Sequence, residues 1–151
     1  MLTATFDGLP ALAGSEIGVS DWLTIDQARI NLFAQATGDR QWIHVDRERA
    51  KTELPGGRTI AHGYLTLSLI PALIQDLLRI EGLARGINYG ADKVRFTAIV
   101  PEGSRVRARQ KLLSVTPRGG GLQLVSEITI EIEGEKRPAL VAETIAILYG
   151  K

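Results

Sequence analysis

The chain has no cysteine and only two histidines among its 151 residues. Without cysteine it forms no disulfide and carries no thiolate nucleophile, so a reducing compartment suits it. The same shortage leaves few ligands for a zinc site, and we expect no bound metal. Neither sign of charge dominates, because 18 Lys and Arg stand against 17 Asp and Glu. This balance gives no reason to expect a nucleic-acid partner.

The sequence also has no long uninterrupted apolar run. Polar or helix-breaking residues divide the longest run, 65–80, which is too short and too polar for a membrane span. The N-terminus has no basic stretch leading into an apolar one, which predicts no signal peptide. A chain of this length fits one domain that buries about two-thirds of its unfolded surface. We therefore expect one soluble, cytoplasmic domain over 1–151 that does not bind membranes.

Helix signals lie in the first half of the chain. Residues 1–14 are rich in Gly, Ala and Pro and are expected to be irregular, and a short strand is expected over 17–23. Thr24 and Gln27 have the spacing of a capping box, which predicts a helix that begins after Thr24. Gly38 is well placed to end this helix.

Two further helices are predicted before the strands begin. Asp46 suits the N-cap of a short polar helix over 47–52, after an extended or looped segment over 41–45. Residues 64–80 are apolar on nearly every side, which is typical of a helix enclosed by other structure. Pro71 predicts a bend within it.

Strand signals fill the second half. The expected strands cover 87–89, 93–96, 105–115, 122–133 and 139–149. Apolar and polar residues alternate over 122–133, whereas 139–149 is apolar on both faces and is expected to be a central strand. Helices followed by antiparallel strands with short connections predict an α+β domain, in which one curled sheet wraps round one buried helix.

Both histidines lie in one short window. Asp39 and His44 are five residues apart in a turn-rich segment, and His62 directly precedes the predicted buried helix. A carboxylate and an imidazole suit general acid–base chemistry, because imidazole titrates near ~6.5. Alternatively, Asp39 caps a turn and His44 is only hydrogen-bonded. The N–H of Gly63 would be unpaired at the helix start and could bind a developing oxyanion, unless this glycine serves only a turn.

The motifs resemble the MaoC-like hydratases in identity and order. The matching segments are Gly38-Asp39 with His44, Ala61-His62-Gly63 before an apolar helix, Val94-Arg95-Phe96, and Val100-Pro101-x-Gly103-Ser104-x-Val106. The resemblance runs from about residue 17 to residue 149. It implies the hotdog fold, an antiparallel curled β-sheet wrapped around a long central α-helix. Trp42-Ile43-His44 and Ile87-Asn88-Tyr89-Gly90 are most similar to the branch with nodulation protein N and mycobacterial short-chain hydratases.

The resemblance also implies an activity. R-specific enoyl-CoA hydratases of this family add water reversibly to trans-2-enoyl-CoA and give (R)-3-hydroxyacyl-CoA. By this likeness Asp39 and His44 hold the water and handle both protons, and the Gly63 N–H polarises the thioester. No metal or redox cofactor is implied, since coenzyme A is part of the substrate. The chain departs from the family pattern at Gln41 and Trp42, where Asn and Pro are usual, which bears on substrate preference.

Several other residues are candidates for binding the substrate. These are Gln41, His62, Asn88, Tyr89, Lys93 and Arg95. His62 has a structural role as its alternative, and the basic residues could simply lie on solvated strand faces. Other functions remain open: a dehydratase of 3-hydroxyacyl chains on a carrier protein, a hotdog thioesterase, or a non-catalytic protein that binds acyl thioesters. A curled sheet over one helix leaves edges that need a partner, so we expect a homodimer.

Overall fold

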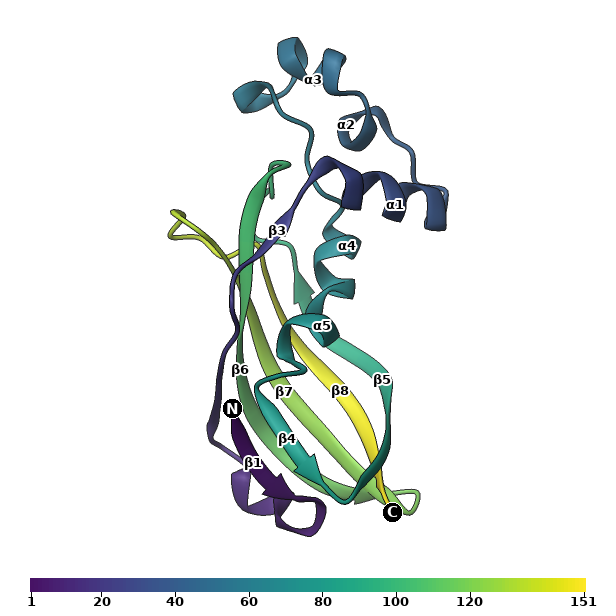
Figure 1. Cartoon of the computed structure of the whole chain (residues 1–151), viewed down its shortest axis with the longest axis vertical. Helices are drawn as coiled ribbons and strands as arrows, with labels where there is room; N and C mark the ends of the chain where they lie inside the picture. Colours follow the sequence, from purple (N-terminus) through teal and green to yellow (C-terminus); the bar gives the residue numbers. More distant parts are fainter.

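A computed structural model describes all 151 residues of the chain. A curled antiparallel sheet holds two short helices against its concave side, and three further helices form a separate group beyond one end (Figure 1). The strands are β1 (Leu2–Thr5), β2 (Glu16–Val19), β3 (Leu23–Ile25), β4 (Leu78–Glu81), β5 (Leu83–Arg95), β6 (Ser104–Arg118), β7 (Gly121–Ile132) and β8 (Leu140–Gly150). The helices are α1 (Gln27–Thr37), α2 (Trp42–Val45), α3 (Arg47–Glu53), α4 (Gly63–Ser68) and α5 (Ile70–Ile74), with 3-10 helices η1 (Phe6–Leu12) and η2 (Pro55–Gly57).

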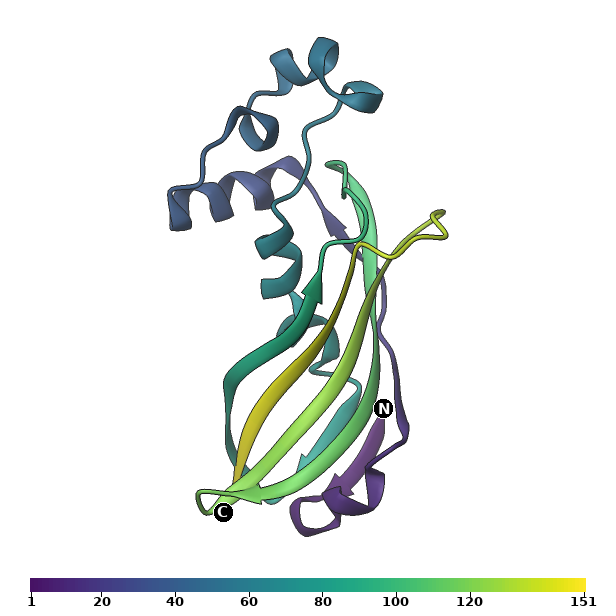
Figure 2. The ribbon, with the colours of Figure 1, turned by 180° about the vertical axis from the view of Figure 1, so that it is seen from behind.

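The six-stranded sheet has the order β2-β6-β7-β8-β5, and β3 also pairs with β6. Alternate residues of β7, such as Ile128 and Ile130, are fully buried and lie opposite Ala142 and Leu140 of β8. The alternation predicted for 122–133 is therefore confirmed, and β8 lies between β7 and β5, away from either edge, as expected. Seen from behind, the long strands run side by side and bend around the helices (Figure 2).

The buried helix is shorter than predicted. It consists of α4 and α5, which are separated at Leu69, and Pro71 occupies the first turn of α5. Proline is tolerated there because a first-turn N–H has no partner within the helix. The prediction of helix up to residue 80 was wrong, since Leu78–Glu81 forms β4 and pairs in parallel with β1. The alternation of apolar Leu78 and Ile80 with polar neighbours is the strand signal that the apolar run concealed.

One core joins the helices to the sheet. Leu65, Leu69 and Leu73 of α4 and α5 are buried in the same cluster as Ile128 and Ile130 of β7. Burying such side chains against the sheet stabilises each by about 1.5–3 kcal/mol, which holds α4 in a fixed place. A smaller cluster around Leu9 and Leu112 closes the other end of the sheet, where both chain termini lie (Figure 1).

The start of α1 differs from the prediction in one residue that matters. Asp26, not Thr24, is the N-cap, and its side chain accepts a hydrogen bond of 2.9 Å from the Arg29 N–H. Thr24 belongs to β3 and pairs with Arg105 of β6, so the sheet already determines its conformation. Gly38 ends α1 with φ of 82°, as predicted, because a residue at that position needs the left-handed conformation.

Four other local predictions were wrong or incomplete. Residues 1–14 contain β1 and η1, and 17–23 is divided between β2 and β3. Residues 41–45 hold the short helix α2, although Asp46 caps α3 as predicted. The two short strands expected before residue 97 are one strand, β5, with register shifts around Gly90. No helix is both long enough and apolar enough to cross a membrane.

Candidate active site

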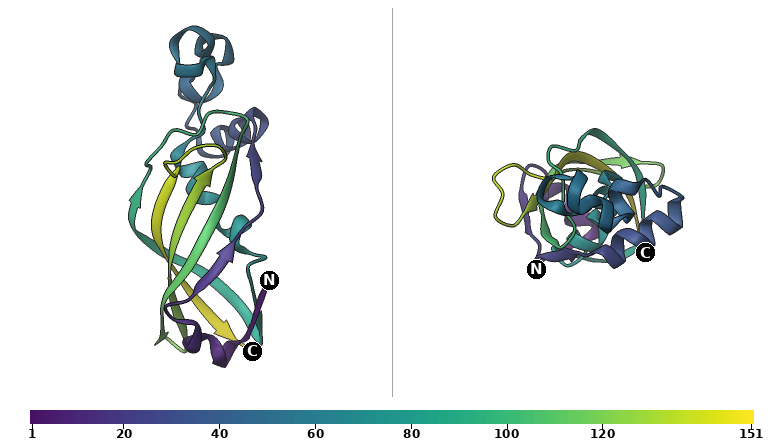
Figure 3. Two further views of the ribbon diagram at one scale, coloured as in Figure 1. Left: turned by 90° about the vertical axis from the view of Figure 1, so that its left-hand side faces the viewer. Right: turned by 90° about the horizontal axis from the view of Figure 1, so that it is seen from above.

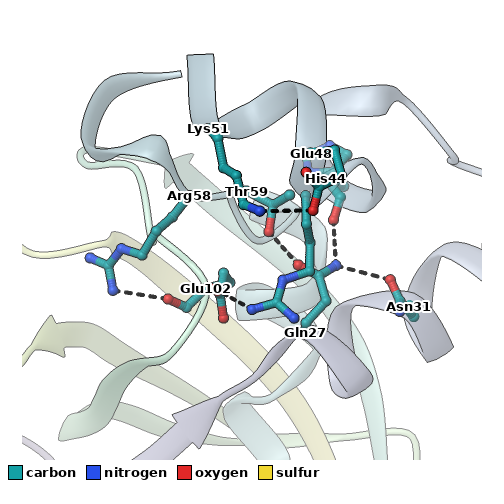
Figure 4. A network of polar contacts seen from close by, with 9 residues as sticks. Gln27, Asn31, His44, Glu48, Lys51, Arg58, Thr59 and Glu102 are labelled. Carbon is teal, nitrogen blue, oxygen red and sulfur yellow. Dashed lines mark hydrogen bonds and ion pairs between the residues drawn. The ribbon is translucent and has the colours of Figure 1, made fainter. Parts of the chain in front are cut away.

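A hydrogen-bond network attaches α2 to α1. Gln27, in the first turn of α1, donates from Nε2 to the His44 carbonyl at 2.7 Å and to Asn31 Oδ1 at 2.9 Å. Its Oε1 accepts a hydrogen bond from the Thr59 hydroxyl, which is 1% exposed. Figure 4 shows Gln27 between these groups. One side chain therefore ties α1, α2 and the chain before α4 together, and this fixes the backbone that carries His44.

The backbone around His44 sets the tautomer of its ring. Nδ1 lies 2.7 Å from the Ile60 carbonyl oxygen, and because a carbonyl only accepts, Nδ1 carries the proton. The lone pair is then on Nε2. Burial lowers the pKa of His44, and His62 lowers it further, while the Ile60 carbonyl and Asp39 act in the opposite direction. His44 is therefore neutral at pH 7 with a basic Nε2.

His62 supports both members of the Asp39–His44 pair. Its ring stacks on His44 with 3.8 Å between centroids, and Phe33 packs on it at 4.9 Å. Its Nε2–H donates to the Asp39 carbonyl oxygen at 2.9 Å, which holds the loop that carries Asp39. His62 is 3% exposed, and its Nδ1 has no hydrogen-bond partner. The geometry gives His62 a positioning role between the other two residues.

Asp39 and His44 are close enough to share a water molecule. One Asp39 carboxylate oxygen and one ring nitrogen from each histidine lie within 4.8 Å of one another. Two hydrogen bonds of 2.8 Å at a tetrahedral angle span about 4.6 Å, so a single water can bridge such a gap. Asp39 itself is exposed, and its Oδ1 is 3.4 Å from the Gln41 backbone N. The pair predicted from sequence is therefore assembled at one place.

The same three residues fit a metal ion poorly. The two imidazole rings are stacked with only 22° between their planes, so their lone pairs lie in two nearly parallel, separate planes. An ion about 2.1 Å from a nitrogen of each ring would lie well out of both planes. We conclude that this arrangement suits a shared water better than a shared ion.

A cavity of about 560 Å³ lies beside His44, and we call it the histidine cavity. Its lining residues are His44, Ile60, Ala61, Gly63, Thr66, Phe96, Thr97, Ala98, Ile99, Val100, Arg137 and Ala139. Gly63 begins α4, where its N–H has no carbonyl to pair with inside the helix. A methyl group on Gly63 would lie 2.9 Å from the Phe96 ring, so any larger residue would crowd the cavity wall.

The other predicted binding residues lie away from this cavity. Asn88 and Tyr89 line a second cavity of about 890 Å³ between α4, α5 and β5, which we call the strand cavity. Lys93 is exposed and pairs with Glu143 at 3.2 Å, and Arg95 donates to the Val94 carbonyl oxygen. Gln41 is exposed next to Asp39, and its side chain does not cap α2. The structure thus brings Gln41 and His62 to the Asp39–His44 pair, whereas the remaining four candidates do not line the histidine cavity.

Three residues of the histidine cavity were not identified from the sequence. Thr66 follows Gly63 by three residues, and this polar interruption in an apolar helix was the available signal. Phe96 ends the Val94-Arg95-Phe96 segment that contributed to the resemblance, but nothing in the sequence placed Phe96 or Arg137 at this cavity. Arg137 is exposed and is the only charged side chain in the lining.

Comparisons with known proteins show which family the chain belongs to. A family model described as MaoC like domain matches residues 10–130. Over 138 residues the chain is 53% identical to 3-hydroxyacyl-thioester dehydratase Z of Mycobacterium tuberculosis, a match that covers 91% of each chain. It is 49% identical over 142 residues to nodulation protein N of Rhizobium leguminosarum bv. viciae, covering 93% of this chain and 88% of that protein.

A solved structure shares the same architecture. The unliganded R-hydratase PhaJ1 of Pseudomonas aeruginosa matches 92% of this chain and 83% of its own, with a TM-score of 0.71 and 24% identity. The fold, with its curled sheet around α4 and α5, is the hotdog fold. The chain belongs to the MaoC-like family. Within that family it is a hydro-lyase, an enzyme that adds water to or removes it from its substrate.

Proposed function

We propose that the chain is an R-specific enoyl-CoA hydratase, which adds water reversibly to trans-2-enoyl-CoA to give (R)-3-hydroxyacyl-CoA. The observation that carries this proposal is the Asp39–His44 pair within 4.8 Å, beside a cavity that Gly63, the first residue of α4, helps to line. The 53% identical relative carries the name 3-hydroxyacyl-thioester dehydratase Z, which describes the reverse direction of the same chemistry.

The geometry suggests how the protons move. Asp39 accepts a hydrogen bond from one O–H of the water and orients it, and this O–H bond stays intact. His44 Nε2 removes the other proton as the water oxygen bonds to C3. The electrons of the double bond move onto the thioester oxygen, and the Gly63 N–H stabilises this enolate. His44 then returns its proton to C2 on the same face, so the atoms of one water are added across the double bond. The reverse sequence releases water.

Hydration of crotonyl-CoA, followed as loss of the enoyl absorbance, tests the proposal. Chiral chromatography of the hydrolysed product should give the (R)-3-hydroxy acid. An (S) product or no turnover with enoyl thioesters of any tested chain length would reject the proposal. Free coenzyme A, detected with a thiol reagent, would instead indicate a thioesterase.

A separate experiment must decide whether the acyl chain is carried by coenzyme A or by a carrier protein. A dehydratase of carrier-protein-bound chains uses the same residues, so kcat/KM must be measured with crotonyl-CoA and with a crotonyl carrier protein. A ratio above about 10 in favour of coenzyme A supports the proposal. Turnover of the carrier-bound substrate alone would support the alternative.

We also propose that two copies of the chain form a homodimer through β5. This strand is the edge of the sheet, because it pairs with β8 on one side and with no strand on the other. Ile87 and Tyr89 on it are 49% and 53% exposed. A 13-residue edge strand with apolar side chains is prone to pair with another chain. Two-fold pairing covers the exposed β5 edge of each copy at the same time.

Light scattering at micromolar concentration tests this proposal. The wild-type chain should have twice the mass of the monomer, and Ile87→Lys should shift it toward monomer. Leu32→Lys is the matched control, because Leu32 is also exposed but lies on α1, away from the edge. A stable wild-type monomer would rule the dimer out. A cytoplasmic location stays a prediction from the sequence.

A further inference from the structure

Thr66 has an unusual environment for a threonine in a helix. It is 2% exposed, and its Oγ1 has no hydrogen-bond partner. A buried hydroxyl without a partner destabilises the protein, because the loss of its hydration is not compensated. The usual remedy in a helix is a bond to the carbonyl four residues earlier. Here that carbonyl belongs to His62, and it already accepts the N–H groups of Leu65 and Thr66 at 3.1 and 3.3 Å.

The Thr66 hydroxyl lies on the same face of α4 as Gly63. Residues three apart lie on the same face of a helix, and side chains lean toward the helix N-terminus. The Thr66 side chain therefore lies over the first turn of α4, on the side of the Gly63 N–H. Thr66, Gly63 and His44 all line the histidine cavity. An unpaired donor thus lies in the wall beside the site where the thioester must bind.

We propose that the Thr66 hydroxyl donates a hydrogen bond to the thioester oxygen of the bound substrate, as a second donor beside the Gly63 N–H. This rests on the proposed function. The unpaired hydroxyl of the free protein gains its partner when substrate binds, and it gains most when the oxygen carries the negative charge of the enolate. Thr66 is then a catalytic residue that the sequence pattern around Asp39 and His44 does not include.

Two substitutions separate this role from packing. Thr66→Val keeps the shape and removes the hydroxyl, and Thr66→Ser keeps the hydroxyl. With crotonyl-CoA, we expect Thr66→Val to lower kcat/KM by about 10- to 50-fold, mainly through kcat, and Thr66→Ser to stay within about threefold of wild type. Thr66→Val breaks no hydrogen bond of the free protein, so its Tm should be unchanged or higher.

Thr97→Val is the matched control for stability. Thr97 lines the same cavity, but its hydroxyl already donates to the Pro138 carbonyl oxygen. Its removal should therefore lower Tm, in contrast to Thr66→Val. The proposal is overturned if Thr66→Val keeps kcat/KM within twofold. It is also overturned if Thr66→Ser loses as much activity as Thr66→Val, or if Thr66→Val lowers Tm as much as Thr97→Val.

A binding measurement keeps the test separate from the proposed reaction. If the wild-type chain hydrates no enoyl thioester, the proposed function fails, and calorimetry with butyryl-CoA, a saturated thioester, still tests the hydroxyl. Thr66→Val should then weaken binding about three- to tenfold, while Thr66→Ser should not. Equal binding by both variants, or no binding of butyryl-CoA by wild type, would overturn the assignment of Thr66.

Discussion

The two cavities beside α4 and α5 differ in how their polar groups are paired. In the histidine cavity, Thr66 Oγ1 is buried without a partner, and His44 presents a basic Nε2. In the larger strand cavity, the buried polar side chains Gln110 and Ser126 bond to each other at 3.1 Å. A buried polar group that is already hydrogen-bonded within the protein gains little from a ligand, whereas an unpaired one gains a hydrogen bond when a ligand binds. This difference is why we propose that the chemistry occurs in the smaller cavity, although the larger one has more room.

The largest effect should come from the ionisable pair of the histidine cavity. Asp39→Asn and His44→Gln are each expected to lower kcat by about 100-fold or more, because each removes one group that handles the water. Steady-state hydration of crotonyl-CoA measures this, and circular dichroism checks that the fold is kept. Asp76→Asn, an exposed carboxylate on another part of the surface, is the control. Near-normal turnover by either pair variant would show that the pair is not the acid–base machinery.

Crowding each cavity with one methyl group should sharpen the comparison. Gly63→Ala places a methyl 2.9 Å from the Phe96 ring, and Gly86→Ala places one 2.7 Å from Leu148 in the strand cavity. We expect Gly63→Ala to lose about 3 kcal/mol of transition-state stabilisation, roughly 150-fold, with Tm changed by a few degrees. Gly86→Ala should mainly lower Tm. A Gly63→Ala protein that melts much earlier yet keeps its specific activity would assign Gly63 to packing.

A smaller effect is expected at His62, which touches both members of the pair. His62→Phe keeps a ring against His44 but removes the Nε2–H bond to the Asp39 carbonyl. A loosened Asp39 loop should lower kcat about tenfold, with little change in KM, because positioning is lost rather than binding. Kinetics on the variant and on His62→Gln, which keeps a donor, measure this. If both variants match wild type, His62 does not position the site.

The smallest effect concerns pH. Burial lowers the pKa of His44 below its unfolded value of about 6.5, so between the two values the unfolded chain binds a proton that the folded chain does not. Stability should therefore fall as the pH drops below about 6.5. Tm measured from pH 8 to 5 should show a steeper fall for wild type than for His44→Gln.

A second group sets the lower limit for this measurement. The hydrogen bond from Arg107 is the largest effect that holds the pKa of Glu131 below 4.5. Burial acts in the opposite direction, and a second hydrogen bond, from Arg109, lowers the pKa as well. The contribution of Glu131 to stability is present above pH 4.5 and is lost as the pH falls through the lower folded value. Above pH 5 the two effects are separate. Identical slopes for wild type and His44→Gln in that range would contradict a lowered pKa for His44.

Local signals predicted the elements that local interactions decide. Gly38 ends α1 because that position needs the left-handed backbone conformation, which glycine adopts easily. Asp46 caps α3 through its own side chain. The alternation over 122–133 specified β7 because one face is buried. By contrast, Thr24 was misread as a cap because β6, eighty residues later, pairs with it. The same limit applies to β4, which lies near the middle of the sequence and pairs with β1 at its start.

The site was predictable where its residues share one short window. Asp39, His44 and Gly63 come from 25 successive positions. His44 and Gly63 line one cavity, and an Asp39 carboxylate oxygen lies within 4.8 Å of a His44 ring nitrogen. Their chemical roles remain predictions. Phe96 and Arg137 reach the cavity only through the pairing of β5, β7 and β8, so their contribution depends on tertiary structure. Asn88 and Tyr89 line the strand cavity, and their predicted part in binding the substrate stays a prediction. Figure 3 shows the curvature of β5 from the side and the small helices above it.

The main-chain carbonyls that hold the two histidines have a consequence for how this enzyme can change. Ile60 and Asp39 each accept from a ring through the backbone, so substitution of either side chain leaves the acceptor in place. The proton therefore stays on Nδ1 in His44 and on Nε2 in His62 whatever side chains those positions carry. Drift at neighbouring positions can reshape the entrance for a different acyl chain while the protonation pattern is inherited unchanged. The backbone path therefore preserves the tautomers of both histidines even where the side chains along it change.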